Sequence, residues 1–227
     1  MSRIRFQQGL DELKHKLLVM AGLSEQALQL AIRGYRERDQ QFCRQVFERE
    51  RDINTIEREI DHLALDLLAM QQPMAVDLRF ILAVIKINTD LERVGDQAVN
   101  IAERVQELID RPPIDLPVDL PEMAELASKM IRSALDSFIR ADPQLAGQVC
   151  IMDDDVDRMN GEAQLVLGRL IQANPQTARV CIDAIIISRN LERIADHATN
   201  IAEDVIFWTS GKDVRHGEHA ASHRHDG

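Results

Sequence analysis

The chain has 227 residues, 45% of them hydrophobic, and a formal net charge of −11. This length suits one large domain or two small ones with a true core, and the acidic balance argues against non-specific binding of nucleic acid or anionic lipid. The first residues are charged, no stretch of about 20 residues is apolar enough to span a membrane, and the three cysteines form no CxxC motif. We therefore expect a cytoplasmic protein with free thiols.

Helices are expected along most of the chain, because Ala, Leu, Ile, Glu and Arg dominate and no segment alternates apolar and polar residues over the length of a strand. Four of the seven prolines lie in RPPIDLPVDLP, which a helix cannot cross. Asp142-Pro143 and Asn174-Pro175 match a helix N-cap followed by proline at the first helical position. The expected helices span residues 7–38, 40–71, 75–109, 120–141, 143–173 and 177–209.

The sequence repeats itself at two fixed offsets. At an offset of 103 residues, Met20-Ala21 matches Met123-Ala124; at an offset of 100, LERVGDQAVNIAE matches LERIADHATNIAE, and 10 of the 18 positions from 88 to 105 are identical to their partners. We therefore predict an all-α protein of two tandem three-helix units. The first unit spans 7–110, a proline-rich linker 111–119, the second unit 120–210, and a flexible histidine-rich tail 211–227.

Acidic and amide side chains share one face of the third helix in each unit. At 100° per residue, Glu92, Asp96 and Asn100 lie within about 80° of one another, opposite the apolar stripe. Carboxylates four residues apart repel one another, and sets of oxygen ligands of this kind suit Mg²⁺, Mn²⁺ or iron. We therefore predict metal ligands at six positions: Glu92, Asp96, Asn100, Glu192, Asp196 and Asn200.

A simpler interpretation remains open, in which this face is solvated and Arg93 or Arg193 pairs with the aspartate three residues later. The second helices hold weaker candidates. Some acids recur in both units, at Asp52 and Asp155 and at Glu59 and Glu162; other pairs have the right spacing but do not align between the units, at Glu57 and Asp61 and at Asp153 and Asp157.

An enzymatic function is not indicated. The sequence has no GxxxxGK[ST], GxGxxG, HExxH or GxSxG motif. A ferritin-like metal store or di-iron protein is the alternative, but it needs two Glu-x-x-His motifs. Glu59 to His62 fits once, and the matching segment of the second unit ends in Leu165.

Four segments closely resemble the PhoU family of bacterial phosphate-uptake regulators. They are QQPMAVDLR at 71–79, LERVGDQAVNIAE at 91–103, LERIADHATNIAE at 191–203 and GKDVRH at 211–216. The resemblance runs from about Gly9 to His216. It implies two three-helix bundles related by pseudo-twofold symmetry, in a cytoplasmic protein that forms homodimers.

The resemblance also implies a function. Such proteins restrain the phosphate ABC transporter through its ATPase subunit, and they help a sensor histidine kinase to repress phosphate-starvation genes. They meet the membrane only through these partners. Some members bind metal through paired E(D)xxxD motifs, which here fall on Glu92 and Asp96 and on Glu192 and Asp196. The metal is left open among Mg, Mn, Fe and Zn.

Overall fold

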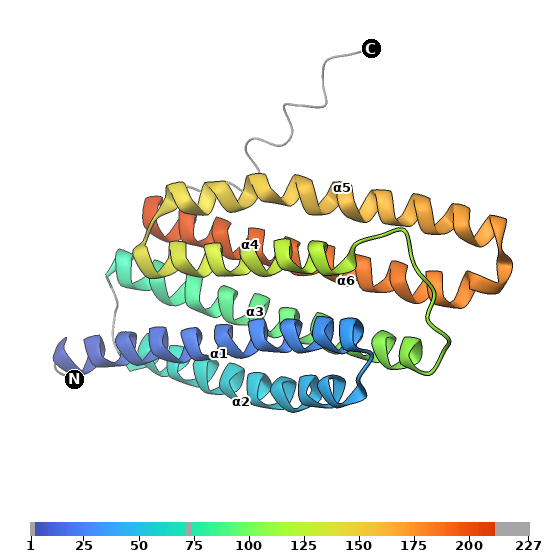
Figure 1. The fold of residues 1–227 in the computed structure, drawn as a ribbon. Coiled ribbons are helices and arrows are strands. Elements are labelled where there is room, and N and C mark those ends of the chain that lie inside the picture. The colour runs from blue at the N-terminus through green and yellow to red at the C-terminus, as the bar shows by residue number, and fades with distance from the viewer. Residues whose placement is uncertain (1–2, 71–73, 212–227) are drawn as a thin grey trace, which may run out of the picture.

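A computed structural model describes residues 3–70 and 74–211, and these ranges hold six long α-helices, one short 3₁₀ turn and no strand (Figure 1). The α-helices are α1 (Arg3–Glu37), α2 (Gln40–Met70), α3 (Ala75–Ile109), α4 (Leu120–Arg140), α5 (Pro143–Ala173) and α6 (Ala178–Ser210), with the 3₁₀ turn at Pro175–Thr177. The predicted all-helical fold and the number of helices are confirmed. The histidine-rich tail beyond Gly211 lies outside the described residues. None of the described helices is long and apolar enough to cross a membrane.

Side-chain caps start the helices of the second repeat where the prolines predicted them. Asp142 Oδ1 accepts hydrogen bonds from the backbone N–H groups of Gln144 and Leu145, at 2.9 and 3.1 Å. Asn174 does the same for Gln176 at 3.2 Å, but this cap begins the 3₁₀ turn, and α6 itself starts only at Ala178. Each cap satisfies backbone donors that have no partner within the helix.

The helix bounds follow the repeat offset closely. Adding 103 to the bounds of α2, 40–70, gives 143–173, the bounds of α5; subtracting 103 from those of α4, 120–140, gives 17–37. The 14 residues at the start of α1, residues 3–16, therefore have no helical counterpart in the second repeat, where the linker precedes α4 instead.

The two three-helix bundles lie side by side and share one core. Helices α3 and α6 pack against each other along the centre, whereas α1 and α4 touch less (Figure 1). Aromatic rings from three helices meet where the bundles join: Phe80 of α3 stacks on Phe138 of α4, and Trp208 of α6 packs against both, with centroids 5.3 Å apart. Because aromatic side chains bury much apolar area, this cluster ties the repeats together.

Gly95 marks a close approach of α3 to α2. A Cβ atom added at Gly95 would lie 3.0 Å from Ile53 Cδ1, which is tighter than ordinary packing. In the second repeat the matching residues are Ala195 and Val156, both buried. One carbon is thus gained on the third helix and one is lost on the second, so the packed volume is conserved between the repeats.

Candidate functional site

The acidic side chains of α3 lie half-buried against α2. Glu92 faces Glu50 and Glu57 of α2, and we call these three residues, together with Asp96 one turn along α3, the first acidic cluster. Burial raises the pKa of Glu92, and the negative charge of Asp96 raises it further. Arg93 opposes this effect, because its guanidinium lies 3.4 Å from Glu92 Oε2 and 3.2 Å from Asp96 Oδ2. The first repeat thus contains the pairing of Arg93 with Asp96 that the simpler interpretation of this face allowed.

The second repeat gathers four carboxylates between α5 and α6. Asp153 and Asp157 of α5 face Glu192 and Asp196 of α6, and we call these the second acidic cluster. Burial, followed by the charges of Asp196 and Asp157, raises the pKa of Asp153 to about 7. Burial also raises the pKa values of Glu192 and Asp196. Asp153 Oδ1 is buried without a hydrogen-bond partner among the described residues, which is costly for a carboxylate.

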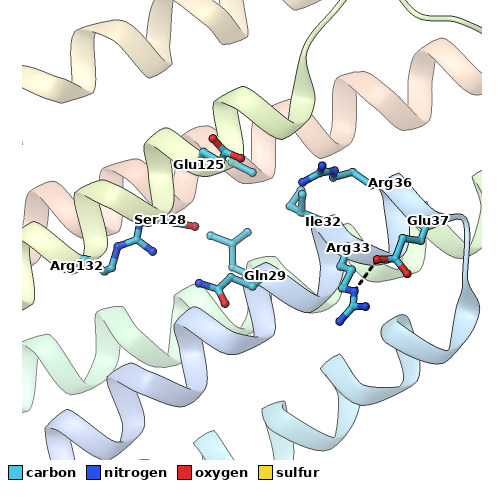
Figure 2. Close-up of a pocket in the computed structure, with 10 residues that line it drawn as sticks. Gln29, Ile32, Arg33, Arg36, Glu37, Glu125, Ser128 and Arg132 are labelled. Carbon is cyan, nitrogen blue, oxygen red and sulfur yellow. Dashed lines mark hydrogen bonds and ion pairs between the residues drawn. The ribbon is translucent and has the colours of Figure 1, made fainter.

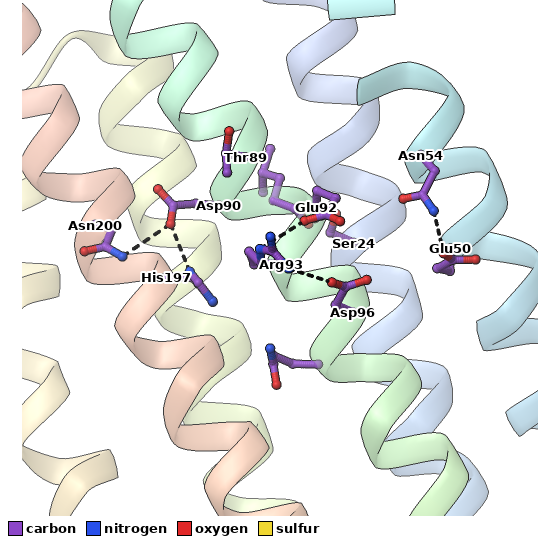
Figure 3. Close-up of polar contacts among 12 residues, drawn as sticks. Ser24, Glu50, Asn54, Thr89, Asp90, Glu92, Arg93, Asp96, His197 and Asn200 are labelled. Carbon is purple, nitrogen blue, oxygen red and sulfur yellow. Dashed lines mark hydrogen bonds and ion pairs between the residues drawn. The ribbon is translucent and has the colours of Figure 1, made fainter. Parts of the chain in front are cut away.

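The two acidic clusters are related by the repeat but differ in charge. The offset of 103 places Glu50 and Asn54 at the positions of Asp153 and Asp157. Asn54 is neutral, and its amide donates a 2.5 Å hydrogen bond to Glu50 Oε1 (Figure 3). Within the part of the chain that the structure describes, the second acidic cluster has no ion pair equivalent to that of Arg93. The second cluster therefore holds the less compensated negative charge.

The two predicted asparagine ligands have other partners. Asn200 donates to Asp90 Oδ1 of α3 at 3.3 Å, across the seam between the repeats (Figure 3). Asn100 donates to Gln97 Oε1, one turn back on its own helix, at 3.4 Å. The structure thus brings Glu192 and Asp196 together with α5, and it holds the Asn200 amide at the seam.

The acids of the second helices divide into two groups. Asp153 and Asp157, which sequence reasoning ranked low, join the second acidic cluster, and Glu57 faces Glu92. The recurrent pairs lie outside the clusters in ion pairs: Asp52 with Arg49, Glu59 with Lys16, and both Asp155 and Glu162 with Arg158. Sequence reasoning missed Glu50 altogether, although the 103-residue offset from Asp153 was the signal that could have found it.

A preformed metal site is not present in either cluster. No group of three or more His, Cys, Asp or Glu side chains in residues 3–70 and 74–211 is arranged to hold a metal ion. The donor set still suits a cation, because four carboxylates repel one another electrostatically and Asp153 Oδ1 is buried with no hydrogen-bond partner among the described residues. Since all these donors are oxygens, Mg²⁺, Mn²⁺ or iron fits better than Zn²⁺, which favours nitrogen and sulfur. Side chains must rotate to complete a coordination shell.

A separate hollow of about 630 Å³ lies between α1 and α4 (Figure 2). Its arginines are mostly neutralised within the chain. Arg33 Nε lies 2.7 Å from Glu37 Oε1, and Arg132 Nη1 lies 2.5 Å from Glu25 Oε1. These pairs argue against a pocket for phosphate or another anion.

Comparison with known proteins gives consistent matches along the chain. The family model described as "PhoU domain" matches residues 17–105 and 120–205. The phosphate-specific transport system accessory protein PhoU homolog of Zymomonas mobilis is 35% identical over 212 residues, which cover 92% of this chain and 88% of that protein. The homolog of the same name from Pseudomonas putida is 37% identical over 215 residues, 93% of this chain and 83% of that protein. The crystal structure of PhoU from Pseudomonas aeruginosa superposes with a TM-score of 0.88 at 35% identity, covering 91% of this chain and 100% of that one.

Proposed function

The chain belongs to the PhoU family of phosphate transport accessory and regulatory proteins, which are not enzymes, and on this premise we propose that it restrains phosphate uptake as a cytoplasmic adaptor. Its partners are the ATPase subunit of a phosphate ABC transporter and a sensor histidine kinase, and it contacts the membrane only through them. The observation that carries this proposal is that both repeats match the PhoU domain. The names of the relatives support the link to phosphate transport.

Deletion of the gene tests this function. Loss of the adaptor should raise phosphate uptake and switch on phosphate-starvation genes in phosphate-rich medium, and the wild-type chain should reverse both effects. A tagged chain should also retain the transporter ATPase or the kinase after purification. Unchanged starvation genes together with unchanged uptake in the deletion strain would refute the proposal.

Metal binding is the second part of the proposal, and we assign it to the second acidic cluster. Asp153, Asp157, Glu192 and Asp196 would hold Mg²⁺, Mn²⁺ or iron, and a bound cation would supply positive charge to an otherwise acidic face. The raised pKa of Asp153 supports this assignment. Without a cation this carboxyl keeps its proton up to about pH 7, so cation binding should release a proton there.

The first acidic cluster is the weaker candidate for a cation. Arg93 already compensates Glu92 and Asp96, and Asn54 stands where the second repeat has Asp157. A cation would have to displace the Arg93 side chain, which already pairs with two of the four carboxylates. The metal storage alternative has no comparable support, because Glu59 is paired with Lys16 and His62 is exposed.

A further inference from the structure

The second repeat lacks a helical segment that completes the first. Residues 3–16 of α1 lie along the second half of α2 and bury Phe6, Leu10 and Leu13. The contact is close at Gly9, where an added Cβ would lie 2.5 Å from Leu67 Cδ2. An ion pair flanks it, because Lys16 Nζ lies 2.8 Å from Glu59 Oε2. An amphipathic helix with a basic flank therefore covers this half of α2.

In the second repeat, linker residues rather than a helix lie beside the matching half of α5. Figure 1 shows α5 and α6 extending beyond the start of α4, where the linker crosses. A hollow of about 340 Å³ remains there, lined by Pro117, Val118 and Met123 on one side and by Met159, Ala163 and Val166 on the other. At the position of the fully buried Ile60, the second repeat has the smaller Ala163. We call this hollow the α4/α5 groove.

The rim of the α4/α5 groove is acidic. Asp119, Glu122 and Glu162 line it, and the one cation among its lining residues, Arg158, already pairs with Glu162 and with Asp155. Glu162 matches Glu59, but the residue that matches Lys16 is Asp119. The groove thus keeps the acidic partner and lacks the lysine. Nearby, Leu165 is 64% exposed on α5.

We propose that the α4/α5 groove binds a basic amphipathic helix of another protein, in the way that residues 3–16 bind α2. Apolar side chains spaced three or four residues apart would enter between Val118 and Val166, as in other helix-in-groove complexes. Met159, which is partly exposed, suits such a surface, because methionine side chains adapt to different shapes. A lysine or arginine on the helix would pair with Glu162 or Glu122. The proposal rests on the proposed function only for the identity of the partner.

The test uses a labelled peptide of residues 3–16 as the probe and measures fluorescence anisotropy with the full-length protein. Saturable binding is expected. A163I places an isoleucine in the groove, as at the matching Ile60 of the first repeat. This variant should bind the peptide about tenfold more weakly. A173I, on an exposed residue at the end of the same helix, is the matched control and should leave the affinity unchanged. Circular dichroism checks that each variant is folded.

Charge reversal provides the second arm, on a side chain exposed enough to leave folding intact. The E162K protein should bind the wild-type peptide more weakly than the wild-type protein does. A peptide carrying K16E should bind the E162K protein more tightly than the wild-type peptide does. The proposal fails if the wild-type protein does not bind the peptide, or if A163I binds it as well as A173I does. It also fails if A163I changes only the oligomeric state in sedimentation, since the groove is then an interface between copies. If the peptide binds as expected but the deletion strain shows no change in phosphate uptake or in starvation genes, only the proposed function is refuted, and the groove proposal stands.

Discussion

His197 Nδ1 lies 2.9 Å from Asp90 Oδ1 and links α6 of the second repeat to α3 of the first (Figure 3). The repeat offset of 100 matches Asp90 with Asn190 and His197 with Gln97. One side of the seam between the repeats thus carries an ionisable pair, and the other carries two neutral amides.

Replacing the ionisable pair by its counterpart should weaken the seam. D90N/H197Q should lower the free energy of unfolding by ~1 kcal/mol, because both side chains are mostly buried and make a close polar contact. Urea unfolding of the wild type, both single variants and the double variant measures the coupling between the two positions. Single effects that simply add up would contradict a direct interaction.

The raised pKa of Asp153 makes stability depend on pH. The folded chain keeps this proton up to about pH 7, whereas the ordinary pKa is 3.8. The contribution of Asp153 to stability is therefore fully present below about pH 4 and is lost as the pH rises through 7. In metal-free buffer, D153N should be more stable than the wild type at pH 8 by ~1 kcal/mol, a figure that allows for solvent screening.

Urea unfolding between pH 4 and pH 8 checks this, with D154N on the exposed neighbouring residue as the control. The wild type should lose stability more steeply with pH than D153N does. Parallel curves for the two proteins would show that Asp153 titrates normally.

Metal content should depend on the second acidic cluster. A chain that ends at residue 211 should retain Mn²⁺ after it has been loaded and dialysed. The D153N/D157N variant of this chain should bind Mn²⁺ about tenfold more weakly or not at all. E50Q/E57Q, which removes the two α2 carboxylates of the first acidic cluster, should bind nearly as the wild type does, because Arg93 already compensates the other two. Elemental analysis and calorimetric titration provide the measurement. Equal losses in both variants would contradict the asymmetry between the clusters.

The packing of Gly95 against Ile53 should show coupling. G95A gains helix propensity, by about 1 kcal/mol, but presses its new methyl group against Ile53. I53V alone removes a buried methyl group, at a cost of about 1 kcal/mol. The double variant G95A/I53V reproduces the pair Ala195 and Val156 of the second repeat. Its free energy of unfolding should exceed the value expected from adding the two single effects by at least ~0.5 kcal/mol. Thermal and urea unfolding of the four proteins test this.

Local rules predicted most of the fold. The bounds of α2 and α5 and the start of α4 follow from proline and capping residues, whose effects are confined to one turn of helix. The acidic face of the third helices follows from the helical period alone. Neither rule says which neighbouring helix faces Glu92 or Glu192, because that depends on how three amphipathic stripes pack.

The sequence by itself determined that this protein is a duplicated, all-helical chain whose third helices each carry an acidic face. Only the tertiary structure decided that Asp153 and Asp157 complete one acidic cluster, that Glu50 and Glu57 face Glu92 in the other, and that Asn200 binds Asp90 across the seam. The physical reason is the distance along the chain over which each effect acts. Helix propensity and periodicity act over a few residues, whereas these contacts join residues 35 to 110 positions apart, which only the packing of the shared core brings together.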